Sequence, residues 1–205
     1  MYRLWYNISM KSRYLSQEEL NQILVNIPTQ HRLIYKIAYE TGMRIGDVLK
    51  IRKSDIKCEK NAYFLQFIAE KTQKRGKAPL SDSTADELMR RRAGRRNFIF
   101  PSDRARSGHL TRQYAWKMFK DAATAAGIDI SGVSPHALRK SFAADLLKKS
   151  SYSQVKKALQ HSYDSVTNEY AFSDILSGKQ PDAAITWREV DALTAIIAAR
   201  IADKK

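Results

Sequence analysis

The sequence feature that most constrains the fold is a single clear pair of strands with helical periodicity on both sides of it. Aromatic and branched side chains at residues 63–69 predict one strand, the polar residues 72–76 predict a turn, and residues 77–80 predict the returning strand. A short buried strand is also expected at residues 97–100, where Pro101 ends it. We therefore predict a mostly α fold with a small antiparallel β-sheet, in the α+β class.

Capping residues mark the predicted helices. Ser16 and Glu19 have the spacing of a capping box and predict a helix that runs to about residue 26. Gly42 and Gly127 each stand where a left-handed cap would end a helix. The remaining helices are predicted at residues 30–41, 44–51, 83–92, 111–126, 136–149, 151–160, 165–170 and 186–201.

Apolar stripes indicate which faces of two helices are buried. In the helix predicted at 111–126, the apolar row is Tyr114, Met118, Ala122 and Ala125. The helix predicted at 186–201 is strongly amphipathic, with a stripe that consists of Trp187, Val190, Leu193, Ile197 and Ile201. We expect this stripe to be buried against the chain's own core or against another copy of the chain.

The charge balance indicates a polyanionic partner. The chain has 36 Lys and Arg against 21 Asp and Glu, a net charge of +15 over 205 residues. Solubility alone needs a net charge of only about 2–8 on a small domain. The excess therefore favours nucleic acid as the partner.

The cysteine and histidine content argues against disulfides and metal sites. Cys58 is the only cysteine, so no internal disulfide is expected and a reducing cytoplasm is the natural compartment. The four histidines are scattered and have none of the clustered spacings of metal sites, so neither a metal nor another cofactor is expected. No apolar run approaches the length of a membrane helix, and no signal peptide is apparent, so we expect no membrane association.

Six side chains, taken together, suit phosphodiester chemistry without a metal. Such a reaction needs cations on the non-bridging oxygens, an acid for the departing alkoxide and a nucleophile. The candidates, in chain order, are Arg44, Lys71, His136, Arg139, His161 and Tyr170.

Each candidate suits one role. The two arginines would hold the phosphate, because a guanidinium stays charged and matches two oxygens at once. Lys71 would donate a proton to a 5′-hydroxyl, and either histidine would accept the proton of Tyr170 or hydrogen-bond the phosphate. Ordinary roles are open to each residue alone, such as an ion pair between Arg44 and Asp47.

Four segments, in this order and spacing, resemble the catalytic domain of the tyrosine recombinases, the phage integrase family. TGMRIGDVLKIRKSDI at 41–56 resembles the first arginine box, and EKTQKRGKAPL at 70–80 resembles the lysine hairpin. HALRKSFAADLL at 136–147 resembles the His-x-x-Arg box, although Lys140 stands where the family often has histidine. LQHSYDSVTNEY at 159–170 resembles the segment of the second histidine and the tyrosine.

The resemblance implies a tyrosine-recombinase catalytic-domain fold and a division of the chain into four parts. Residues 1–13 would be an N-terminal extension, 14–172 the DNA breaking-rejoining domain, 173–185 a linker and 186–205 the C-terminal amphipathic helix. Typical members also carry an N-terminal helical domain that clamps the DNA, so a one-domain chain is expected to grip DNA weakly.

The resemblance also implies the reaction and the partners. Tyr170 would attack the scissile phosphate to form a 3′-phosphotyrosyl bond, and religation would follow strand exchange with neither ATP nor metal. The implied partners are double-stranded DNA, accessory DNA-bending proteins and three further copies of the chain, joined through the C-terminal helix. Further DNA contacts are expected from Lys74, Arg75, Lys77, Arg104, Arg106 and Lys140. A cytoplasmic, nucleoid-associated protein of bacterial, archaeal or phage origin is expected.

Two other functions stay open at this point. A non-catalytic DNA-binding or regulatory protein could keep the fold and the basic surface, although a pure binder has no need of all six candidate residues. A topoisomerase-like nicking-closing enzyme would keep the phosphotyrosine chemistry without the exchange of strands.

Overall fold

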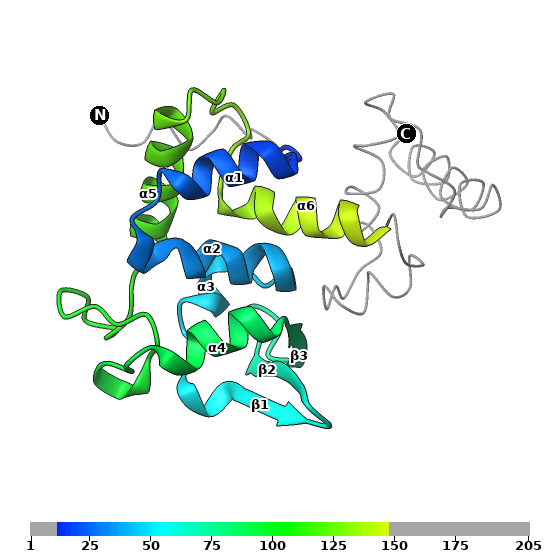
Figure 1. Cartoon of the computed structure of the whole chain (residues 1–205). Coiled ribbons are helices and arrows are strands. Elements are labelled where there is room, and N and C mark those ends of the chain that lie inside the picture. Colours follow the sequence, from blue (N-terminus) through cyan, green and yellow to red (C-terminus); the bar gives the residue numbers. More distant parts are fainter. Residues whose placement is uncertain (1–11, 148–205) are drawn as a thin grey trace, which may run out of the picture. The chain divides into compact units, whose positions relative to one another are not determined.

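The computed structural model of the chain describes residues 12–147, which form a group of helices with a small sheet at one side of it (Figure 1). The described α-helices are α1 (Gln17–Val25), α2 (Thr29–Thr41), α3 (Ile45–Val48), α4 (Asp82–Arg90), α5 (Arg112–Ala125) and α6 (Pro135–Leu147). The strands are β1 (Ile56–Glu59), β2 (Ala62–Ile68) and β3 (Arg75–Leu80), and 3₁₀ turns lie at Lys53–Asp55 and Arg95–Asn97. This architecture confirms the predicted mostly α fold with a small antiparallel sheet. Among the described residues, no helix is both long and apolar enough to cross a bilayer.

The predicted caps set the helix ends. Ser16 Oγ accepts a hydrogen bond from the Glu19 amide at 3.2 Å, and the Glu19 carboxylate accepts one from the Ser16 amide at 2.9 Å. These two bonds complete the capping box of α1. Gly42 ends α2 at a φ of 64°, and Gly127 follows α5 at a φ of 70°, which are left-handed conformations that suit glycine.

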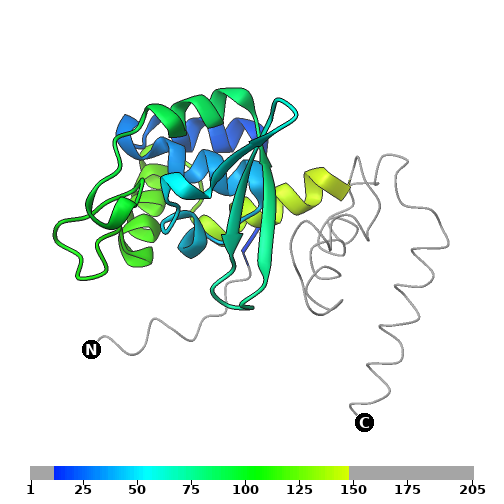
Figure 2. The same cartoon turned by 90° about the horizontal axis from the view of Figure 1, so that it is seen from below.

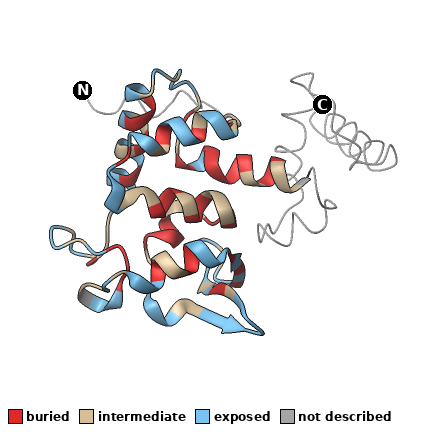
Figure 3. Cartoon of the chain, in the orientation of Figure 1, coloured by how far each residue is buried: buried red, intermediate tan, exposed pale blue. Residues whose placement is uncertain are grey.

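The sheet has the order β1-β2-β3 and is antiparallel throughout (Figure 2). Strand β1 was not predicted, because it is only four residues long and largely exposed, and it lacks a run of aromatic or branched residues (Figure 3). The two-residue turn that pairs it with β2 has positive φ angles at Lys60 and Asn61, 48° and 61°. Strand β3 begins at Arg75, so the predicted turn at 72–76 extends too far toward the C-terminus.

Two further predictions are wrong in extent. The helix predicted at 44–51 is helical only over α3, because the chain beyond it pairs with a distant segment. The Ile99 amide donates to the Ile51 carbonyl at 2.9 Å, and Arg52 forms an isolated bridge with Phe98. Residues 98–100 are accordingly a buried segment with a single bridge, whereas Asn97 is exposed and ends a 3₁₀ turn, so the predicted strand at 97–100 is not formed.

The core joins α2 to α5. Tyr35 of α2 is fully buried and stacks on Phe119 of α5, with the ring centroids 5.0 Å apart. Its hydroxyl donates to the Ala115 carbonyl at 2.8 Å, and burial raises its pKa. The buried face of α5 is therefore Ala115, Phe119, Ala122 and Ala123. The predicted row is wrong at Tyr114, which is 46% exposed, and at Ala125, which is exposed too.

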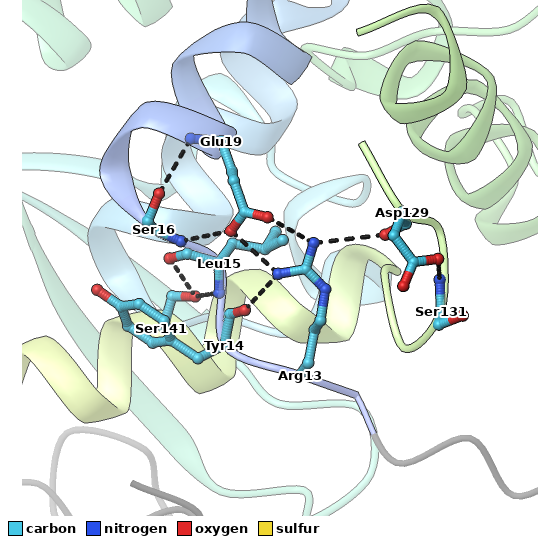
Figure 4. Close-up of polar contacts among 8 residues, drawn as sticks. All are labelled: Arg13, Tyr14, Leu15, Ser16, Glu19, Asp129, Ser131 and Ser141. Atoms are coloured by element: carbon cyan, nitrogen blue, oxygen red, sulfur yellow. Dashed lines mark hydrogen bonds and ion pairs between the residues drawn. The ribbon is translucent and has the colours of Figure 1, made fainter. Parts of the chain in front are cut away.

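The segment that precedes α1 is bonded to α6. The Leu15 amide donates to Ser141 Oγ at 2.9 Å, and the same hydroxyl lies 3.2 Å from the Leu15 carbonyl, to which it donates (Figure 4). Arg13 reinforces the segment, because its guanidinium contacts the Glu19 carboxylate at 2.6 Å and donates to the Asp129 carbonyl at 3.4 Å (Figure 4). The two bonds of Ser141 hold α6 beside the start of the described chain.

Candidate functional site

A cavity of about 390 Å³ opens between α3, the β2–β3 turn and the first turn of α6. It brings together four of the six predicted catalytic residues, which come from segments separated by up to 95 positions of sequence. Its lining consists of Met43, Arg44, Ile45, Gly46, Asp47, Glu70, Lys71, Arg112, Pro135, His136 and Arg139.

Arg44 is the N-cap residue of α3, where its backbone is extended at a φ of −66° and a ψ of 139°. The ion pair with Asp47 that was an open alternative is not formed. Arg44 has no ion pair and no hydrogen bond from its side chain to any of the residues 12–147. Its guanidinium is therefore available to a ligand in the cavity.

Asp47 instead holds the turn that carries Lys71. Its side chain is buried, and Oδ1 accepts a hydrogen bond from the Glu70 amide at 3.0 Å. Glu70 is tied to the same region a second time, by an ion pair of 2.8 Å with Lys50. The hydrogen bond from Lys50, helped by the charges of Lys50, Arg112 and His109, lowers the pKa of Glu70 below its ordinary value.

Lys71 lies in the turn between β2 and β3, as predicted for a hairpin tip. Its side chain is exposed and makes no hydrogen bond or ion pair within the described part of the chain. The anchoring of Glu70 beside it places the ammonium at the cavity, where it can donate a proton.

The His-x-x-Arg pair enters from α6. His136 lies in the first turn of α6 and is exposed, whereas Arg139 is only 4% exposed. The Arg139 guanidinium donates a short hydrogen bond to the carbonyl of Gly42, the residue that ends α2. Gly42 is the left-handed cap of α2, and Arg44 follows it by two residues. The same turn therefore directs the chain to Arg44 and supplies the carbonyl that holds Arg139.

The other predicted residues do not line this cavity. Lys74 is exposed in the β2–β3 turn, and Arg104 and Arg106 are exposed in a loop. Lys77 lies in β3, pairs with Glu59 at 2.7 Å and sits 3.6 Å from the centre of the Phe64 ring. Their roles in DNA binding stay predictions.

Lys140 and Arg75 have distinct settings. The Lys140 side chain is buried, and its Nζ donates to the Ser12 carbonyl at 3.0 Å, next to the bonds that Ser141 makes. Arg75 lies in β3 on the wall of a second cavity of about 800 Å³, which Lys50, Arg52 and Arg96 also line. This larger cavity is strongly basic, and Asp47 contributes to the walls of both cavities.

His161 and Tyr170 lie outside the described residues, and so does the helix predicted at 186–201. The four residues that the cavity does bring together supply two guanidinium groups, an ammonium and an imidazole. This set can neutralise a phosphate and transfer protons. None of the four is the proposed nucleophile, which would come from another segment of the chain.

Sequence reasoning missed Arg112, which lines the same cavity from the first position of α5. A signal for it was present. A cation in the first turn of a helix opposes the helix dipole, so an arginine directly after the Thr111 cap is unfavourable for stability and points to another role.

The family model described as the phage integrase family matches residues 13–175, which cover all six candidate catalytic residues. The chain belongs to the phage integrase family. The resemblance predicted from the four sequence segments is thereby confirmed.

Curated relatives that this chain matches are tyrosine recombinases. It is 33% identical over 147 residues to the tyrosine recombinase XerD of Rhizobium meliloti, a match that covers 68% of this chain and 46% of that protein. It is 30% identical over 142 residues to the tyrosine recombinase XerA of Pyrococcus furiosus, covering 66% and 48%. The chain thus spans about half the length of the curated relatives it matches.

Solved structures show the same fold. The XerH site-specific recombinase in a post-cleavage complex with a palindromic difH substrate superposes with a TM-score of 0.67 at 23% identity, covering 86% of this chain and 54% of that one. The catalytic domain of bacteriophage HP1 integrase gives a TM-score of 0.61 at 20% identity, covering 86% of this chain and 100% of that one. This chain therefore has the fold of the tyrosine-recombinase catalytic domain.

Proposed function

We propose that this chain is a site-specific DNA recombinase, which cleaves and rejoins double-stranded DNA through a 3′-phosphotyrosyl intermediate. The observation that carries the proposal is the cavity that gathers Arg44, Lys71, His136 and Arg139. The four residues come from three segments, which are the start of α3, the β2–β3 turn and α6. Two of them, Arg44 and Lys71, make no hydrogen bond or ion pair with the described residues. A pure binding module could use the cations but has no need of the proton-transfer groups that Lys71 and His136 add.

In the proposed reaction, Tyr170 attacks the phosphorus atom of the scissile phosphate and displaces the 5′-oxygen of the next nucleotide. The proton of the tyrosine hydroxyl passes to a histidine, His136 or His161, and Lys71 gives a proton to the departing 5′-oxygen. Arg44 and Arg139 neutralise the charge that grows on the non-bridging oxygens. The reverse attack by a 5′-hydroxyl religates the strand and frees the tyrosine, so no ATP is consumed and no metal is required.

The larger organisation belongs to the same proposal. Residues 14–172 would form the breaking-rejoining domain and 1–13 an extension, and the linker 173–185 would carry the helix at 186–205 to a neighbouring copy. Four copies would then assemble on two duplexes. A solved relative of the fold, lambda integrase, is described as a tetramer bound to a Holliday junction, which supports this arrangement.

The test is covalent capture of DNA. The protein and its Tyr170→Phe variant are incubated with random-sequence duplexes that carry scattered nicks, and denaturant-stable protein–DNA adducts are counted. We expect adducts from the wild type alone, and sequencing of the captured DNA then identifies the target. Adducts that persist in the variant would refute Tyr170 as the nucleophile, and salt-sensitive binding without adducts would favour a non-catalytic DNA-binding protein.

Two refinements separate the remaining alternatives. On two distinguishable duplexes that carry the captured sequence, recombinant products support the recombinase, whereas relaxation of supercoiled circles alone supports a nicking-closing enzyme. Replacement of the 5′-bridging oxygen by sulfur gives a leaving group that needs no proton. The cleavage defect of Lys71→Ala should therefore disappear on the sulfur substrate if Lys71 is the general acid.

A further inference from the structure

Arg112 is a cation of the cavity that the predicted catalytic set does not include. It lies at the start of α5, and it lines the cavity together with Arg44, Lys71 and Arg139. Its side chain makes no hydrogen bond and no ion pair with any of the residues 12–147. Its charge is nevertheless felt inside the site, because it contributes to the lowered pKa of Glu70.

The packing of Arg112 depends on a missing side chain. A Cβ added to Gly46 of α3 would lie 2.9 Å from Arg112 Cδ, which is closer than real contacts allow, and 3.6 Å from Cγ, an ordinary contact distance. The aliphatic part of Arg112 therefore lies directly on α3, two residues beyond Arg44. Glycine at this position lets the guanidinium stay close to the cavity.

Folding stability does not account for Arg112. A cation in the first turn of a helix opposes the helix dipole, and Arg112 forms no hydrogen bond or ion pair with an acidic side chain among the described residues, although its charge reaches Glu70. A bound anion would reverse this balance. An arginine that costs stability, faces a cavity of cations and remains unpaired is best explained by a phosphate ligand.

We infer that Arg112 is a DNA-contacting residue whose guanidinium binds the backbone phosphate adjacent to the one that is cleaved. The inference rests on the proposed function. Arg112 and Arg139 both line the cavity, but Arg112 is exposed whereas Arg139 is only 4% exposed. If the scissile phosphate lies against the buried Arg139, as the proposed function requires, the more exposed Arg112 suits the next phosphate along the strand.

The inference predicts a change in the salt dependence of DNA binding. Each phosphate contact to duplex DNA contributes a slope of about −0.9 in log K against log salt. Arg112→Ala should therefore make the slope shallower by about 0.9. When the salt is lowered from about 1 M to about 0.1 M, the affinity of the variant should then rise roughly eight-fold less than that of the wild type. The loss should appear in the DNA concentration for half-maximal cleavage rather than in the rate at saturation.

The measurement uses the full chain with Tyr170→Phe, so that covalent capture does not distort the affinity, and a labelled random-sequence duplex, so that it does not depend on a captured sequence. Lys117→Ala is the matched control, because Lys117 lies on the same helix but pairs with Asp121 at 2.7 Å and does not line the cavity. The control should keep the wild-type slope, and Arg112→Lys should keep it too because the charge remains.

Gly46→Ala gives a second reading that is independent of the charge. Alanine favours a helix over glycine, so the variant should be at least as stable as the wild type. The added methyl would nevertheless push Arg112 away from α3 and weaken DNA binding. Unchanged affinity in this variant would count against the inference.

The inference is overturned if Arg112→Ala keeps the wild-type slope of log K against log salt. A loss of the cleavage rate at saturating DNA with that slope unchanged would show a role in the chemical step instead. Binding is measured without cleavage, so these outcomes are distinct from a failure of the proposed function. In that case the wild type would form no adduct whatever the slopes are.

Discussion

The hydroxyl of Ser141 is expected to be a main determinant of the stability of the site, because it joins α6 to the segment before α1. Ser141 is fully buried, two residues beyond Arg139, and its hydroxyl bonds both the amide and the carbonyl of Leu15 (Figure 4). Leu15 is also buried, so neither backbone group can turn to water when the hydroxyl is removed. Ser141→Ala is therefore the perturbation that isolates this link.

The magnitude follows from the two orphaned backbone groups. A buried donor or acceptor that loses its partner costs about 1–3 kcal/mol, and the two groups here share one small site. We expect Ser141→Ala to lower the free energy of unfolding by about 2 kcal/mol. For a chain of this length, that corresponds to a fall of about 4–8 °C in Tm.

The assay is urea unfolding followed by circular dichroism, with the m-value as a check that the unfolding transition is unchanged. Ser54→Ala is the control, because Ser54 is exposed and its hydroxyl makes only a 3.4 Å contact with Asp55. The control should stay within about 0.5 kcal/mol of the wild type. If Ser141→Ala is as stable as the control, the reasoning from buried unsatisfied groups is refuted.

Two other predictions concern the turn of Lys71 and the response to acid. Asp47→Ala removes the acceptor of the Glu70 amide, a bond of about 1.5–3 kcal/mol, so adduct formation should slow by roughly ten-fold or more. This defect should shrink on the 5′-sulfur substrate if Asp47 acts by positioning Lys71, and an equal defect on both substrates would contradict that role. Burial, helped by the charge of Arg91, lowers the pKa of His31 in the folded state, so the unfolded chain binds a proton more readily. The free energy of unfolding should therefore decrease as the pH falls from about 6.5 through the folded pKa of His31. In urea titrations between about pH 7 and pH 5, His31→Gln should lose less stability than the wild type.

Local signals were sufficient for most of the helices and for the hairpin. The capping box at Ser16 and the glycine at 42 act within a few residues of the helix ends they define, so they can be found without a structure. Strand β1 was missed and α3 was predicted too long, because both depend on pairing with segments that are not their neighbours in sequence. The row assigned to α5 was wrong at Tyr114 and Ala125, because periodicity alone does not say which of two adjacent apolar faces the core covers.

For this protein, the sequence by itself determined the family, the fold class and the order of the residues suited to phosphate chemistry. It did so because capping, strand propensity and motif spacing are properties of neighbouring residues. Only the tertiary structure decided that Asp47 holds the Glu70 amide instead of pairing with Arg44, and that Arg112 joins the cavity across from Gly46. Those outcomes depend on contacts between residues 23 to 66 positions apart, and such contacts exist only after the core of α2, α3 and α5 has packed.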